Sequence, residues 1–484
     1  MAVTRFTLIM IEDGTSIRTR GATLAARGFA LVTAFALATA GVLPSEVKPA
    51  RAQEDVTRGL PIIRDTEIEQ LMRDYAQPIL KVAGLAQQNV RVVVLSDRTF
   101  NAFVMDGRHI FINAGALFDS KTPNEIIGVF AHETGHLAGG HLLRLREQLA
   151  TAQTASIVAL LASVGAMVAG GRSGSGNVGG AAVAAPQATI MRSLLAYVRT
   201  QEDQADHAGV KFLTLSGQSP KGMVDLFTRL TNESLFNSRY IDPYLQSHPM
   251  PAERVAALER LAKASPYWDR KDPPELQLRH DLMRAKLSGF LEQPDTVARR
   301  YPLGDHSLAA RYARAISTYR HADLRQAIVQ IDGLIQEQPA NPYFEELKGQ
   351  ALLEGGRAAE AVAPLRRAVS LSHNAPLIEI MLGQALIATN NKAVAEEAVE
   401  MLRAAITREP DAPEAYSQLA MAYGRKGDLA NADLASAQAA FTRGDIKTAR
   451  QLATRAKTRL AVGSPAWVRA DDIVNVKPPA IKSQ

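Results

Sequence analysis

The feature that most constrains this chain of 484 residues is a His-Glu-x-x-His motif, formed by His132, Glu133 and His136. On an α-helix, residues four apart lie on one face, one above the other, so both imidazoles are presented to the same point. Two histidines at this spacing suit Zn²⁺. Glu133 lies beside that point without having to bind the metal, and there it can take a proton from the attacking water. The motif therefore predicts a metallopeptidase site with one zinc ion per chain and Glu133 as general base.

The sequence around the motif has the features of a helix. Residues 122–125 read Thr-Pro-Asn-Glu, a capping box with proline at the first helical position. Apolar residues follow at helical spacing. We predict one continuous helix from about Pro123 to Gln148. His141 lies at a different angle from the motif, so it is interpreted as a surface histidine or one that supports a ligand from outside.

A second helix is predicted from about Ile190 to Leu215. A catalytic zinc held by two histidines needs one further carboxylate, and Glu202 on this helix is the predicted third ligand. Asp206, one turn later, can accept a hydrogen bond from a ligand imidazole and fix its tautomer. Arg199, one turn before Glu202, is predicted to pair with a carboxylate beside the site.

Composition excludes two other classes of protein. The chain has no cysteine, which rules out a disulfide framework and a thiolate zinc site. The formal charge is +6, and residues 1–52 supply half of it, because they hold six basic and three acidic side chains. The remaining +3 is spread over more than 400 residues. This is not the charge pattern of a protein that binds nucleic acid.

The first 52 residues are typical of an export signal. A basic stretch ending at Arg27 precedes the apolar run Gly28–Leu43, and a small-x-small site follows, with cleavage expected after Ala52. The alternative is an uncleaved membrane anchor, although the apolar run is short for a spanning helix. We expect an exported mature protein, in the periplasm if the source is Gram-negative, with at most peripheral membrane contact.

The region before the motif predicts a helix over residues 60–86, a strand over 90–95 and a hairpin over 103–112 that turns at 105–108. An exposed edge strand beside a peptidase site can pair with an extended substrate backbone. The candidate for this edge consists of Asn101, Ala102 and Phe103.

Residues 157–180 combine an apolar segment with a glycine-rich tether. Ile157–Ala169 is too short to span a bilayer comfortably. Gly170–Gly180 has the composition of a flexible linker. Two interpretations stay open, a lid that closes over the site and a mobile loop without such a role.

Small residues recur with a long period in the C-terminal half. One series is Ala315, Gly349, Gly383 and Ala420, with steps of 34, 34 and 37, which predicts three extra residues around Asn390. The period resembles that of tetratricopeptide repeats, which stack helix pairs into a concave solenoid, whereas a generic helical bundle is the alternative. A last helical pair over residues 437–460 is expected to cap the array.

The order of these motifs is similar to that of the HtpX-type zinc metallopeptidases. The matching stretches are Thr-Pro-Asn-Glu, His-Glu-Thr-Gly-His, Glu-Asp-Gln-Ala-Asp, and a later Ser-His-Pro with a following arginine. The resemblance implies the same three zinc ligands and the same base, and it adds His248 and Arg254 to the site. It also implies that His248 latches the fourth position of the zinc. The other role left open for His248 is a hydrogen bond to the transition-state oxyanion.

The membrane members of that family have several spanning helices that this chain lacks, which points to an exported soluble branch. A zinc peptidase followed by such repeats resembles the periplasmic proteases that enhance β-barrel assembly. The expected fold is a mostly helical α+β zincin-type domain with a small sheet, followed by an all-α solenoid. The expected divisions are a signal peptide (1–52), a peptidase domain (53–265), a helical connector (266–304), the repeats (305–462) and a flexible tail (463–484).

The resemblance implies a metalloendopeptidase that degrades misfolded or stalled outer-membrane proteins and gives chaperone-like help to their assembly. Its partners would be such unfolded proteins and, through the repeats, the outer-membrane β-barrel assembly machinery. The alternative is a repeat-containing chaperone or scaffold whose zinc site is mainly latent.

Overall fold

The structure, a computed structural model, describes residue 57 and residues 59–150, 178–236 and 243–476. The predicted export signal lies outside these residues. The chain divides into two compact units, and the boundaries fall between Ile62 and Ile63, between Leu71 and Met72, and between Pro273 and Pro274. We refer to Met72–Pro273, with the described residues up to Ile62, as the peptidase unit. Ile63–Leu71 and the chain from Pro274 onward form the repeat unit. No described helix is long and apolar enough to cross a membrane.

A four-stranded sheet lies in the N-terminal part of the chain, with strand order β1-β2-β4-β3. Its strands are β1 (Ile62–Ile63), β2 (Arg91–Leu95), β3 (Ala102–Val104) and β4 (His109–Asn113). β2 and β4 are parallel, whereas β3 and β4 form the predicted antiparallel hairpin. Asp106 closes the turn by accepting the backbone N–H groups of Arg108 and His109, both at 2.8 Å. β3 is an edge strand, as predicted.

The first predicted helix was too long at its start. α2 spans Thr66–Val82, because Ile62 and Ile63 belong to the sheet and Asp65 caps the helix by accepting the N–H of Ile68 at 3.0 Å. The start of the helix is therefore set by the extended residues Ile62 and Ile63 and by the capping Asp65 that follows them.

The motif helix α4 (Pro123–Gly139) is the centre of the peptidase unit, and its residues from Pro123 to His136 are all buried. The predicted continuous helix to Gln148 is wrong, because Gly140 adopts a left-handed φ of 62° and ends α4. A further helical stretch begins at His141. The capping box is also altered. The Thr122 side chain makes no capping bond, and Asp272 accepts the N–H of Asn124 instead, at 3.0 Å.

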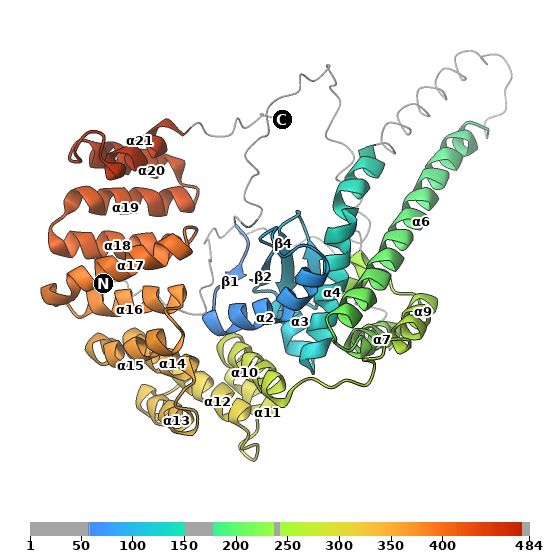
Figure 1. The fold of residues 1–484 in the computed structure, drawn as a ribbon, viewed down its shortest axis with the longest axis horizontal. Helices are drawn as coiled ribbons and strands as arrows, with labels where there is room; N and C mark the ends of the chain where they lie inside the picture. Colours follow the sequence, from blue (N-terminus) through green and yellow to red (C-terminus); the bar gives the residue numbers. More distant parts are fainter. Residues whose placement is uncertain (1–56, 58, 151–177, 237–242, 477–484) are drawn as a thin grey trace, which may run out of the picture. The chain divides into compact units, whose positions relative to one another are not determined.

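Two helices pack against α4. They are α6 (Val178–Leu215), which runs alongside α4 in Figure 1, and α7 (Lys221–Phe236). α6 approaches closely, because a Cβ at Gly135 would lie 2.9 Å from the backbone oxygen of Ala205. α6 begins earlier than the predicted Ile190 and includes the last residues of the glycine-rich stretch. The rest of the predicted lid, residues 157–177, lies outside the described part of the chain.

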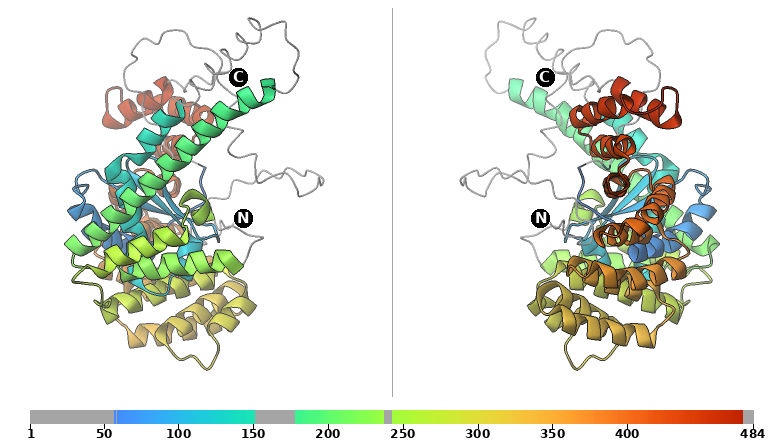
Figure 2. Two further views of the ribbon diagram at one scale, coloured as in Figure 1. Left: turned by 90° about the vertical axis from the view of Figure 1, so that its right-hand side faces the viewer. Right: turned by 90° about the vertical axis from the view of Figure 1, so that its left-hand side faces the viewer.

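The repeat unit contains α10 (Pro274–Leu291), α11 (Pro294–Arg300) and, within the described residues, five successive helix pairs, which are drawn from yellow to red in Figures 1 and 2. The pairs are α12 (Leu308–His321) with α13 (Leu324–Glu337), α14 (Pro342–Glu354) with α15 (Ala358–Leu371), α16 (Pro376–Ala388) with α17 (Ala395–Arg408), α18 (Pro413–Lys426) with α19 (Leu429–Thr442), and α20 (Ile446–Lys457) with α21 (Pro465–Asn475).

The helix spacing confirms the predicted period. The first helices of four pairs begin at residues 308, 342, 376 and 413, which gives steps of 34, 34 and 37. The extra residues form a short 3₁₀ turn at Lys392–Val394, after Asn390 with a φ of 60°.

The C-terminal end of the repeats differs from the prediction. The expected final pair at residues 437–460 starts inside α19, which ends at Thr442, and the last pair is α20 with α21. The predicted flexible tail from residue 463 contains the helix α21 (Pro465–Asn475). It forms because Ser464 caps it, accepting the N–H of Trp467 at 3.2 Å, and because Ala470 and Ile473 are buried. Residues 477–484 lie outside the described chain.

Candidate metal centre

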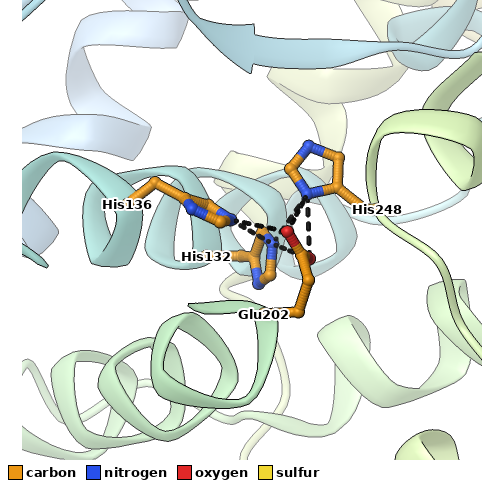
Figure 3. Close-up of side chains that lie close together, drawn as sticks. All are labelled: His132, His136, Glu202 and His248. Atoms are coloured by element: carbon orange, nitrogen blue, oxygen red, sulfur yellow. Dashed lines mark hydrogen bonds and ion pairs between the residues drawn. The ribbon is translucent and has the colours of Figure 1, made fainter. Parts of the chain in front are cut away.

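Four side chains from three segments meet beside α4. His132 and His136 come from consecutive turns of α4, Glu202 from α6, and His248 from the residue after α8 (Pro243–Ser247). All four are buried, and their nearest nitrogen and oxygen atoms lie within 4.8 Å of one another. Figure 3 shows the three rings and the carboxylate directed toward one point. The structure thus brings together the predicted ligands and the residue that resemblance added.

The separations between these atoms fit a metal ion. Nε2 of His132 and Nε2 of His136 are 3.1 Å apart, and each lies 3.4 Å from an oxygen of Glu202. Nδ1 of His248 is 3.3 Å from Nε2 of His132 and 3.0 Å from Oε2 of Glu202. A tetrahedral zinc with bonds of about 2.0–2.1 Å places its ligand atoms about 3.3 Å from one another. The donor set therefore has the spacing and chemistry of a zinc site.

The charges around this point also favour a dication. Glu133, Glu202 and Asp206 are buried carboxylates, and the Arg254 guanidinium pairs with Glu202 and Asp206. When all are ionised and the imidazoles are neutral, as metal ligands must be, the group carries a net charge of about −2, and such an imbalance is costly inside a protein unless a counter-ion is bound. Burial opposes ionisation of Glu202, but the neighbouring His248 and His132 lower its pKa well below the ordinary value.

Asp206 and Arg254 hold His132 from behind. Oδ1 of Asp206 lies 3.0 Å from Nδ1 of His132, so an Nδ1–H tautomer directs Nε2 toward the other donors. Arg254 donates to both oxygens of Asp206 at 2.7 and 2.8 Å. Burial would lower the pKa of His132, but its hydrogen bonds to Asp206 and Glu202 raise it to about 9. A metal ion that enters must therefore displace a proton.

Glu133 has the environment expected of a general base. Both of its oxygens are buried, and neither accepts a hydrogen bond from the residues that the structure describes. Nε2 of His248 lies 3.5 Å from Oε1. Burial is the largest influence on this carboxyl and raises its pKa, which strengthens it as a proton acceptor.

Two other predictions, for Arg199 and for the edge strand, concern residues outside the cluster of four side chains. Arg199 is not part of the cluster, because it is exposed on α6 and forms no ion pair with any described residue. The edge candidate belongs to a strand that contacts the motif helix, since β3 packs against α4. Ala102 is fully buried there, Phe103 stacks on Phe111 with ring centroids 5.3 Å apart, and Asn101 immediately precedes the strand.

Sequence reasoning missed two aromatic residues that surround the histidines. Tyr244 is fully buried and packs over His248, with ring centroids 4.6 Å apart and planes at 34°. Phe227 meets His132 edge to face at 5.6 Å. The signal for Tyr244 was its position four residues before His248, one helical turn away. Phe227 comes from α7, and no local pattern connects it with the motif.

The comparisons with known proteins agree with this site. The model of peptidase family M48 matches residues 63–262, a range that holds all four clustered side chains. The metalloprotease YcaL of Escherichia coli is 32% identical over 187 residues, which are 37% of this chain and 67% of YcaL.

The chain belongs to peptidase family M48. It is thus a metalloprotease by family, and the predicted hydrolase class is confirmed.

Two further relatives are similar to this chain over more residues than the peptidase unit contains. The beta-barrel assembly-enhancing protease of Yersinia pestis is 23% identical over 359 residues, 72% of each chain. A Vibrio cholerae homologue of that protease is 26% identical over 291 residues, which are 59% of this chain but only 58% of the relative. A model of the Psidin N-terminal TPR repeats region matches residues 318–439. These matches confirm the predicted combination of an M48 peptidase domain with tetratricopeptide-type repeats.

Proposed function

We propose that this protein is a zinc metalloendopeptidase of the periplasm, exported by its first 52 residues. The observation that carries the proposal is the convergence of His132, His136 and Glu202 at tetrahedral spacing beside Glu133, whose carboxylate accepts no hydrogen bond from the described residues. These three residues would hold one zinc ion per chain. When bound, the ion supplies Lewis acidity that polarises the scissile carbonyl and the attacking water.

The roles of the chain's own residues follow from their positions. Glu133 accepts the proton of the attacking water and passes it to the leaving amine. Asp206 and Arg254 keep His132 in the tautomer that directs Nε2 toward the ion. The free edge of β3, at Asn101, Ala102 and Phe103, offers a place for an extended substrate to add as a further strand beside α4.

The proposed substrates are misfolded or stalled outer-membrane proteins. Support comes from the printed name of the Yersinia pestis relative, which links that protein to β-barrel assembly, and from the helix pairs that follow the peptidase unit. Stacked helix pairs present extended surfaces that suit protein partners. We therefore include chaperone-like assistance and contact between the repeats and the outer-membrane assembly machinery in the proposal.

The decisive test is the Glu133→Gln variant of the mature protein. It should bind zinc and fold as the parent does but lose cleavage of an unfolded outer-membrane protein, since the amide cannot accept the proton. Zinc content, thermal unfolding and a time course of proteolysis are measured together. Glu253→Gln, an exposed carboxylate on α9 (Ala252–Lys263), is the matched control and should cleave normally. Cleavage by Glu133→Gln at the parental rate would reject the mechanism.

A specific contact also favours the second candidate function, a chaperone or scaffold whose zinc site is mainly latent. His248 occupies the place of a fourth ligand, and its Nε2 faces Glu133. As a latch, it would exclude the attacking water. His248→Ala should then raise basal proteolysis at equal zinc loading. If His248 instead stabilises the oxyanion, the same variant should be slower by roughly 10²–10³-fold. A slower variant rejects the latch.

A further inference from the structure

His141 folds back over the last turn of α4 and contacts a predicted zinc ligand. Its Nδ1 lies 2.9 Å from Nδ1 of His136, and the two rings meet edge to face at 4.9 Å. This contact is made possible by the end of the helix. Gly140 adopts its left-handed conformation directly after α4, and the N–H of Gly140 bonds back to the oxygens of His136 and Leu137. The left-handed Gly140 therefore turns the chain so that the His141 side chain lies against His136.

The contact also needs the absence of a side chain at Gly139. A Cβ at that position would overlap Nε2 of His141, so any larger residue would displace the imidazole. The two consecutive glycines thus have separate roles. Gly140 supplies a backbone conformation that side chains rarely adopt, and Gly139 leaves room for the ring.

α6 fixes His141 from the other side. Nε2 of Gln201 donates to the backbone oxygen of His141 at 3.2 Å. His141 is buried, and so is Gln201. Gln201 directly precedes Glu202. One turn of α6 therefore supplies the predicted ligand Glu202 and also holds His141, which contacts the predicted ligand His136.

We propose that His141 is the positioning residue for His136. It accepts the Nδ1–H of His136, which leaves Nε2 of His136 with its lone pair toward Glu202 and His132. A neutral imidazole that donates from one nitrogen must present the other as an acceptor. His132 is held in the same way by the anionic Asp206, whereas His136 is held by a neutral ring. The inference rests on the proposed metal site.

The first test measures zinc affinity of the full-length mature protein by competition with a chelator. His141→Ala should weaken zinc binding about 10–100-fold, the usual cost of losing a partner behind a ligand. His141→Asn should retain most of the affinity, because its amide oxygen lies near the position of Nδ1. His141→Phe keeps the ring but no acceptor, so it should resemble His141→Ala. His207→Ala, which removes an exposed histidine of α6, should bind zinc normally.

A double-mutant cycle tests the role of Gly139. Gly139→Ala should weaken zinc binding in the parent but add little in the His141→Ala background, because the ring that it displaces is already gone. Additive losses would contradict the assigned role. In ¹⁵N NMR spectra of the zinc-free protein, His136 should carry its proton on Nδ1, and this preference should be lost in His141→Ala and kept in His141→Asn.

The outcomes separate this inference from the proposed function. If the parent and His132→Ala both fail to bind zinc, the metal site itself is rejected. If the parent binds zinc and His132→Ala does not, but His141→Ala and His141→Phe bind as the parent does, the positioning role alone is overturned. A loss in His141→Ala that His141→Asn does not restore also overturns it.

Discussion

Two buried clusters of charged side chains differ in what lies at their centres. In the peptidase unit, three imidazoles and the Glu202 carboxylate converge on one point (Figure 3). In the repeat unit, the ammonium of Lys286 stands at the corresponding centre. It lies 2.7 Å from Asp65, 3.2 Å from Glu67 and 3.7 Å from Glu346.

The side chains of the repeat cluster balance most of its own charge. Lys286 neutralises one of three carboxylates, and Tyr312 donates to Glu67 at 3.0 Å. Burial, opposed by Lys286, raises the pKa of Glu346 to about 8, so this carboxyl holds a proton near neutral pH. Lys286 and the proton on Glu346 thus leave about one negative charge among the three carboxylates. The cluster around His132 differs because four donor atoms surround one point at the spacing of zinc ligands, which is why we assign a metal ion to it.

Removal of Lys286 should have the largest effect on stability. Lys286→Met leaves Asp65 and Glu67 buried without a cation, so we expect a loss of about 3–5 kcal/mol in the free energy of unfolding. Denaturant unfolding of the full chain measures it. Lys348→Met is the matched control, because Lys348 pairs with Asp332 in a more exposed setting and should cost at most about 1 kcal/mol. Equal losses in both variants would show that the cluster around Lys286 contributes nothing special.

Removal of Glu202 should weaken zinc binding more than it lowers the stability of the fold. Glu202→Ala deletes the proposed anionic ligand, so zinc affinity should fall by more than about 100-fold, beyond the usual cost of losing a supporting residue. Chelator competition measures the change in zinc affinity. The Lys286→Met variant, under conditions in which it is still folded, is the control and should bind zinc as the parent does. If Glu202→Ala retains zinc like the parent, Glu202 is not a ligand.

The smallest expected effect concerns pH. Because the folded-state pKa of Glu346 is raised above its ordinary 4.5 to about 8, the folded protein holds a proton that the unfolded chain releases in this range. Stability contributed by this group is therefore lost as pH rises from about 4.5 toward 8. Glu346→Gln should therefore become more stable than the parent as the pH rises to 8, and the two proteins should have similar stability near pH 5.

Unfolding curves of both proteins at several pH values test this prediction. Glu337→Gln, on the more exposed end of α13, serves as the control and should follow the parent. An unchanged difference between Glu346→Gln and the parent from pH 5 to pH 8 would mean that Glu346 is ionised throughout. The cluster around Lys286 would then carry more negative charge than we infer.

Local patterns determined much of what could be predicted. The spacing of His132 and His136 depends only on helical geometry, and the period of 34 residues repeats within the chain, so both were visible without any distant contact. Glu202 was predicted because a zinc with two histidines requires a further carboxylate. The hairpin at Asp106 was also local, since its turn residues are adjacent in sequence.

Other features depend on residues far apart in the chain, and only the tertiary structure could decide them. The arrival of His248 beside Glu202 joins positions 46 residues apart, and the pairing of Glu67 with Tyr312 joins positions 245 apart. Arg199 is exposed although it lies one turn from the buried Glu202, because packing and not spacing selects which residues of α6 are buried. The turn at Gly140 could be predicted only in part from the sequence. Glycine permits a left-handed conformation at many places, so its presence alone does not show where the chain turns. That this one turns His141 onto His136 follows from the contacts with α6.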